Sequence, residues 1–182
     1  RIGEVRMLSA DFGFRGAWQP EERWLNPALA GGALLDVGVY TVAFAEMVFE
    51  QLPAEVEALA HLGETGVDEQ TAMVLGYANG ALALLSCAVR TDTPGGATIS
   101  GTRGTITVPR FWEAPSATLE IKGEEPVQIT GASGYHYQAV EVMRCLRSGA
   151  LESPLMSLDA SLSIARTMDD VRDRIGLRYP MD

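Results

Sequence analysis

The stretch "DEQTAMVLGY" (68–77), the turn Ala78-Asn79-Gly80 and "GALALLSCAVR" (80–90) decide the fold expected for this sequence. Two β-rich runs around an Asn-Gly pair are the strongest short-range signal for a β-hairpin. In 81–89 the alternate residues are apolar on both faces of the strand. A sheet packed on one side only should alternate between apolar and polar residues. The hairpin therefore predicts either helices on both faces of the sheet or a cover from outside the domain on one of them.

Further strand and helix patterns extend outward from this hairpin. Strands are expected at 3–12, 54–62, 97–101, 104–109, 117–122 and 126–130. Helical spacing of apolar residues is found at 32–50, 135–148 and 157–175, with Ser157 as an N-cap and Gly176 as the residue after the last helix. This order predicts a single α+β domain over 1–182, built on a predominantly antiparallel open sheet with helices on one face. The other face would be available for dimerisation.

Composition narrows the classes of function. The chain has a formal net charge of −10 and no cluster of Lys or Arg, so we expect no nucleic-acid partner and no membrane partner. No apolar stretch is expected to approach the ~20 residues that a membrane span needs. Cys87 and Cys145 are expected to be small buried hydrophobic residues in a reducing compartment, and a cytoplasmic location is the default expectation.

The segment "GGALLDVGVY" (31–40) has a glycine-rich start that resembles a phosphate loop, but its context excludes one. A dinucleotide fingerprint needs G-x-G-x-x-G between a strand and a helix, and a P-loop needs Gly-Lys followed by Ser or Thr. Neither is present. The first glycines are expected to free the backbone at a helix start. Gly38, inside the helix, predicts that another segment passes close by.

Asp36 and Tyr40 are spaced i, i+4 and so project from one face of that helix. Two interpretations remain open from the spacing alone. Asp36 could bind nearby backbone while Tyr40 fills the core, or both could face a cleft in which Tyr40 exchanges a proton with a substrate hydroxyl. A tyrosine with a pKa near ~10 is a poor base at neutral pH, so the second interpretation needs a nearby cation, and the sequence does not obviously supply one.

Other kinds of site have little support. His61 and His136 are the only histidines, which excludes a histidine-rich metal site, and the carboxylates lack metal-ligand spacing, so no metal is expected. No nucleophile motif such as G-x-S-x-G occurs. Aromatic residues gather in and around the loop before the helix and at one later turn, where they could cover the core or line a pocket for an apolar ring: Phe12, Phe14, Trp18, Trp24 and Trp112.

"NPALAGGALLDVGVYTVAFAEMV", "ETGVDEQTAMVL", "ISGTRGTITVP" and "GYHYQAVEVMRCLRSG" resemble the glucose–fructose oxidoreductase / inositol dehydrogenase (Gfo/Idh/MocA) superfamily of nicotinamide-dependent enzymes. "ESPLMSLDAS" and "IGLRYP" continue the resemblance, which is closest to the dimeric dihydrodiol dehydrogenase / NADP xylose dehydrogenase branch. Members begin with a Rossmann domain of ~120 residues or more, which carries the glycine-rich fingerprint and a Glu-Lys-Pro motif. The resemblance implies that 1–182 is the C-terminal substrate-binding and dimerisation domain, with the N-terminal Rossmann domain absent.

The resemblance also implies roles for individual residues. Tyr40 would exchange the proton of a secondary alcohol while hydride passes between that carbon and the nicotinamide ring, and Asp36 would hold the hydroxyl or the tyrosine. Three aromatic residues would bind the substrate: Phe14, Trp112 and Tyr137. Arg23 is a candidate contact near the cofactor.

The function implied is the substrate-binding half of an NAD(P)-dependent dehydrogenase acting on a polyol, sugar or dihydrodiol. The cofactor, NADP or NAD, would be bound mainly by the absent domain, so the fragment alone should be inactive. The related enzymes dimerise through the open sheet face, which agrees with the strand pattern. The alternative is a member of the same superfamily that serves as a binding or assembly module without redox chemistry.

Overall fold

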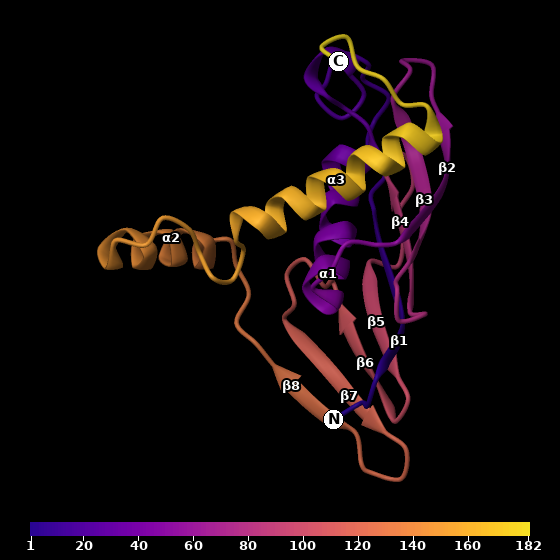
Figure 1. Cartoon of the computed structure of the whole chain (residues 1–182). Helices are drawn as coiled ribbons and strands as arrows, with labels where there is room; N and C mark the ends of the chain where they lie inside the picture. The colour runs from indigo at the N-terminus through magenta and orange to yellow at the C-terminus, as the bar shows by residue number, and fades with distance from the viewer.

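The centre of the structure is an eight-stranded sheet with the strand order β2-β3-β4-β1-β5-β6-β7-β8 (Figure 1). The structure is a computed structural model and describes all of residues 1–182. The strands are β1 (Val5–Gly13), β2 (Glu55–Leu62), β3 (Asp68–Gly76), β4 (Leu82–Ala88), β5 (Gly96–Gly101), β6 (Gly104–Pro109), β7 (Ser116–Ile121) and β8 (Val127–Thr130). Every neighbouring pair is antiparallel except β1 and β4. The expected α+β class with a predominantly antiparallel open sheet is confirmed.

The first strand lies in the middle of the sheet, which the sequence did not predict. β1 runs parallel to β4, with Met7 opposite Leu82, and antiparallel to β5, with Leu8 opposite Ile99. The predicted hairpin is present beside it, since β3 and β4 pair across the Asn79-Gly80 turn. Strand pairs joined by a short turn can be predicted from the local sequence, whereas the position of β1 in the sheet depends on segments far away in the chain.

Two helices cover one face of the sheet. A π-helical segment, η2 (Leu34–Gly38), leads into α1 (Val39–Phe49), and α1 packs against β1, β4 and α3 (Leu158–Ile175). α3 also packs against β2. Its predicted ends are confirmed: the Ser157 side chain accepts a hydrogen bond from the Ala160 N–H at 3.0 Å, and Gly176 is left-handed with φ 70°.

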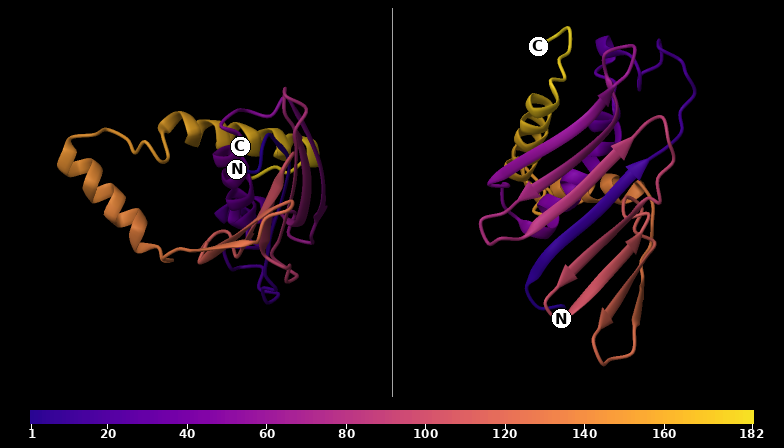
Figure 2. Two further views of the ribbon diagram at one scale, coloured as in Figure 1. Left: turned by 90° about the horizontal axis from the view of Figure 1, so that it is seen from below. Right: turned by 90° about the vertical axis from the view of Figure 1, so that its right-hand side faces the viewer.

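The remaining helix, α2 (His136–Ser148), is the exception to this arrangement. Figures 1 and 2 show it well away from the sheet, beyond the end of β8. Cys145 is its only buried residue. Both cysteines are buried and free, as expected. The cover of the sheet therefore comes from η2, α1 and α3.

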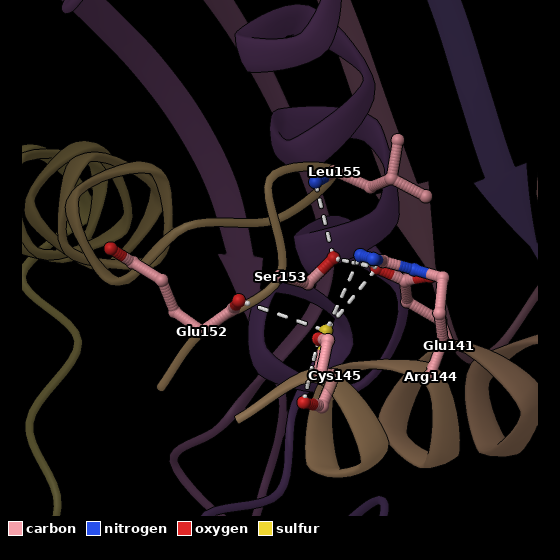
Figure 3. A network of polar contacts seen from close by, with 7 residues as sticks. Glu141, Arg144, Cys145, Glu152, Ser153 and Leu155 are labelled. Carbon is pink, nitrogen blue, oxygen red and sulfur yellow. Dashed lines mark hydrogen bonds and ion pairs between the residues drawn. The ribbon is translucent and has the colours of Figure 1, made fainter. Parts of the chain in front are cut away.

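The connection between α2 and α3 folds back on the polar side of α2 (Figure 3). The Glu141 carboxylate accepts hydrogen bonds from Nε of Arg144 at 2.8 Å and from the hydroxyl of Ser153 at 2.6 Å. The Ser153 hydroxyl accepts in turn from the Leu155 N–H at 3.1 Å. Hydrogen bonding from Arg144, and then from Ser153, lowers the pKa of Glu141 to about 2. The carboxylate therefore stays charged and holds the connection across the neutral pH range.

The outer face of the sheet carries no helix and is rich in apolar side chains. On β4, Leu84 is 41% exposed and Leu85 is 2% exposed, so Leu84 points outward and Leu85 points into the core. The exposed apolar side chains of this face come from four adjacent strands, and we call them the outer apolar face: Met7, Leu59, Val74, Leu82 and Leu84. The sheet is thus apolar on both sides, as the hairpin sequence predicts.

One expectation about apolar stretches is wrong. The stretch Pro27–Phe49, in which a short turn at 30–32 precedes η2 and α1, is long and apolar enough to cross a membrane, by length and composition only. Half of its most apolar window is buried inside the fold. The same length and composition are found in the core helix of a soluble protein, and here the stretch packs against the sheet.

Candidate functional site

The candidate site is built on the π-helical segment and the first turn of α1. Asp36 lies in the segment Leu34–Gly38, and Tyr40 is the second residue of α1. π-helical turns are rare and are often found at functional sites. Gly38 permits a close approach, because a Cβ atom there would lie 2.9 Å from Sγ of Cys87 on β4. The predicted passage of another segment beside Gly38 is therefore confirmed.

Asp36 is paired with Arg23, which comes from the loop before the helix. The guanidinium of Arg23 donates a hydrogen bond to the Asp36 carboxylate and forms an ion pair with it. The Asp36 side chain is 9% exposed, whereas that of Arg23 is 60% exposed. The acid thus has the partner that its apolar surroundings require. The pair also brings a cation to the site, which the sequence did not obviously supply.

Tyr40 is half-buried, and its surroundings favour the neutral phenol. Burial is the main cause that raises the pKa of Tyr40 above its ordinary value. The neighbouring side chain of Tyr135 and the Asp36 carboxylate raise this pKa further, while the Arg23 guanidinium lowers it. Tyr40 is consequently protonated at neutral pH and has a proton to donate.

Aromatic rings surround Tyr40 on the sheet side. The ring of Phe12, on β1, meets the Tyr40 ring edge-on with centroids 5.3 Å apart. Phe12 also stacks on Trp112, with centroids 3.9 Å apart and planes 6° apart. Trp112 itself lies in the turn after β6 and contacts Phe111. These contacts fix the orientation of the Tyr40 ring.

The structure brings only some of the predicted substrate-binding residues to Tyr40. Trp112 is there, joined to Tyr40 through Phe12. Phe14 follows the end of β1 and packs on the margin of the core. Tyr137 lies on α2, where the centroid of its ring is 4.1 Å from that of His136. Tyr135, two residues earlier, is one of the residues that raise the pKa of Tyr40.

Sequence reasoning placed Phe12 among the loop aromatics and did not assign Tyr135 to the site. Phe12 could have been found from strand periodicity, since alternate residues of a strand share a face and Leu8 and Ala10 are buried. No local signal identifies Tyr135, because its approach to Tyr40 depends on how the chain returns from β8.

A cleft of about 670 Å³ opens beside Tyr40. Its walls come from α1, from the turn after β6, from the connection between α2 and α3 and from the start of α3, and most of the lining side chains are apolar. Tyr40 and Trp112 both line it. Asp36 is not part of this wall. The site therefore combines a protonated phenol, an aromatic wall and, on a separate side, an ion pair between the buried Asp36 and the exposed Arg23.

Comparison with known proteins identifies the family. A sequence model described as the GFO/IDH/MocA C-terminal domain matches residues 1–107. The chain belongs to the GFO/IDH/MocA family. The match includes Arg23, Asp36 and Tyr40, and it confirms the resemblance seen in the sequence.

A curated relative supports the same assignment over nearly the whole chain. The chain is 37% identical over 190 residues to a trans-1,2-dihydrobenzene-1,2-diol dehydrogenase of Xenopus laevis. This similarity covers 98% of the chain and 57% of that protein. The chain thus spans little more than half the length of the curated relative that it matches.

Solved structures share the fold of this family member. An aldose-aldose oxidoreductase from Caulobacter crescentus, complexed with glycerol, superposes with a TM-score of 0.80 at 22% identity, over 94% of the chain and 53% of that protein. A 3-ketoreductase from Actinomadura kijaniata, in complex with NADP and TDP-benzene, gives a TM-score of 0.76 at 23% identity, over 95% of the chain and 55% of that protein.

Proposed function

We propose that the chain is the substrate-binding half of an NAD(P)-dependent oxidoreductase that acts on a secondary alcohol or the corresponding carbonyl. The relatives are named as dehydrogenases and oxidoreductases of diols and sugars. The observation that carries the proposal is the protonated Tyr40, held by Phe12 beside the Arg23–Asp36 pair. A sugar or a dihydrodiol is the proposed substrate class.

Tyr40 supplies the proton transfer that such a reaction needs. In the reducing direction its hydroxyl donates a proton to the carbonyl oxygen of the substrate, and in the oxidising direction the phenolate accepts the proton of the alcohol. The raised pKa favours the donor form, and Arg23 stabilises the phenolate once the proton has left. Asp36 holds Arg23 in place for that purpose.

The residues of the chain do not themselves fit the pyrophosphate of a dinucleotide. Binding at a glycine-rich helix start needs free backbone N–H groups. Here the N–H of Gly31 donates to the carbonyl of Asn26 and that of Gly32 to the carbonyl of Trp24. The N–H of Leu34 donates to the carboxylate of Asp68. In this proposal a dinucleotide-binding domain outside these 182 residues therefore holds the cofactor, NADP or NAD.

The outer apolar face is proposed to join two copies of the chain. Contiguous exposed apolar surface of this kind is uncommon on monomers. Four adjacent strands contribute to it, and two such faces could pack sheet against sheet around a twofold axis. We also propose that the enzyme is cytoplasmic and has no nucleic-acid or membrane partner.

The test is an assay of the full-length protein with aldoses and with trans-1,2-dihydrobenzene-1,2-diol, each with NAD⁺ and NADP⁺. Formation of reduced nicotinamide with one of these pairs is the expected result. A folded protein that binds a sugar or diol but reduces neither cofactor would favour the binding-module alternative. The isolated chain 1–182 is the control, and calorimetry should detect no binding of NADPH to it.

A further inference from the structure

Asp68 is a buried acid directly beneath the start of the helix that carries the candidate site. It is the first residue of β3 and is 0% exposed. Oδ2 of its carboxylate accepts a hydrogen bond from the N–H of Leu34 at 2.8 Å and another from the hydroxyl of Thr71 at 2.6 Å. One oxygen thus connects strand β3 to the first residue of the π-helical segment.

This contact replaces a helix cap that the local sequence lacks. The residue at the N-cap position of the π-helical segment is Ala33, which has no side chain able to accept a hydrogen bond. The first N–H groups of a helix need partners from outside the helix. Asp68 provides one of these partners from a strand that is distant in sequence.

The second oxygen of the Asp68 carboxylate, Oδ1, is tightly enclosed by the chain. Oδ1 is buried without a hydrogen-bond partner. A Cβ atom at Gly32 would lie 2.2 Å from it, and Gly32 has φ +113°, a backbone conformation that other residues rarely adopt. Gly32 therefore leaves the space that the carboxylate occupies. Burial raises the pKa of Asp68 to about 6, against the effect of its hydrogen bonds.

Two further contacts hold the chain on either side of Leu34. The hydroxyl of Tyr179, near the C-terminus, donates to the carbonyl of Gly31 at 2.6 Å. Cys87 on β4 lies against Gly38 at the other end of the segment. The backbone runs from the start of this segment through Asp36 and past Gly38 to Tyr40, so a shift at Leu34 would move both side chains.

We propose that Asp68 is a positioning residue, which fixes the start of the segment Leu34–Gly38 and thereby the placement of Asp36 and Tyr40. A buried acid with an unpartnered oxygen is costly in an apolar core. Its hydrogen bond to the backbone that leads to the site accounts for that cost. The consequence for catalysis rests on the proposed function, whereas the consequence for the backbone does not.

The experiment compares Asp68→Ala with Asp68→Asn in the full-length protein. Alanine removes the acceptor, so kcat per folded molecule should fall about 10-fold or more while KM changes less, because displacement of a catalytic group acts on the chemical step. Asparagine keeps one acceptor oxygen and should restore most of the rate. Asp92→Asn is the control, since Asp92 also accepts a backbone N–H, that of Arg15 at 3.0 Å, but in an exposed loop.

Hydrogen exchange gives a readout that does not need activity. In Asp68→Ala, amides 33–40 should exchange about fivefold faster or more, as expected when a helix cap is lost, while those of β5–β7 keep their rates. If Asp68→Ala does not fold, Thr71→Val, which removes one of the two donors, should show the same change to a smaller extent.

The possible outcomes separate the two proposals. Faster exchange at 33–40 in a protein that shows no dehydrogenase activity at all would support the role of Asp68 and contradict the proposed function. An active enzyme in which Asp68→Ala keeps the wild-type kcat, or in which exchange increases evenly through the sheet, would overturn the role of Asp68.

Discussion

The guanidinium of Arg23 pairs with the carboxylate of Asp36, four residues before Tyr40 on the same helical segment. This contact changes the role expected for both residues. Asp36 is occupied by Arg23, so in the proposed reaction it would act on a substrate hydroxyl only together with Arg23. The two charges influence Tyr40 in opposite directions, since the Asp36 carboxylate raises the pKa of Tyr40 and the Arg23 guanidinium lowers it.

The first prediction uses these opposite effects. In the full-length enzyme, Arg23→Gln should raise the pKa of Tyr40 and move the alkaline limb of the kcat/KM profile to higher pH. Asp36→Asn should lower that pKa and move the limb to lower pH. The profiles are measured by steady-state kinetics, with the exposed Lys122→Gln as the control. Shifts of both variants in the same direction would contradict the assignment of the limb to Tyr40.

Tyr40→Phe should lower kcat by ~10²-fold or more, because the phenylalanine ring keeps the aromatic packing but has no proton to exchange. KM should change less, since the contact with Phe12 remains. Tyr77→Phe is the matched control, because Tyr77 is buried against Phe49 in another part of the core. Activity of Tyr40→Phe within a factor of about two or three of the wild type would make Tyr40 a core residue.

Leu84→Glu should convert a dimer into a monomer or an aggregate. The structure decides between the two neighbouring leucines, since Leu84 lies on the outer apolar face and Leu85 lies in the core. Sedimentation equilibrium at micromolar concentration measures the mass. Leu151→Glu is the control, as that side chain is almost fully exposed in the loop between α2 and α3. A monomeric wild-type protein would overturn the proposed interface.

The stability of the protein should depend on pH through Asp68. Its pKa rises from 3.8 in the unfolded chain to about 6 in the fold, so the folded state binds the proton more tightly. The contribution of Asp68 to the free energy of unfolding is therefore fully present below pH 3.8 and is lost as the pH rises through about 6. A shift of this size corresponds to about 3 kcal/mol.

Asp68→Asn removes this titration and provides the reference. The stability of the wild type relative to that of the variant should fall with rising pH in this window, as measured by urea unfolding. Asp68 accepts hydrogen bonds from Thr71 and from the N–H of Leu34. The other groups that face it are Cys87 on β4 and Tyr179, and the charge of Asp68 contributes to raising the pKa of both. Arg172 lies over the ring of Tyr179 and keeps its charge throughout. A constant difference between the two proteins would contradict the prediction.

The sequence by itself determined the elements and their local ends. The Asn79-Gly80 turn, the cap at Ser157 and the left-handed Gly176 depend on neighbours in the chain, and the structure has each where it was expected. Alternating apolar residues gave the two apolar faces of the sheet, because side-chain direction in a strand has a fixed period of two residues.

Only the tertiary structure decided which distant residues meet. It placed β1 between β4 and β5, Phe12 rather than Phe14 against Tyr40, and Arg23 on Asp36. It also brought Asp68 under Leu34 and left α2 away from the sheet. These contacts join segments far apart in the chain, where packing and burial select the partners, and no local pattern records that selection.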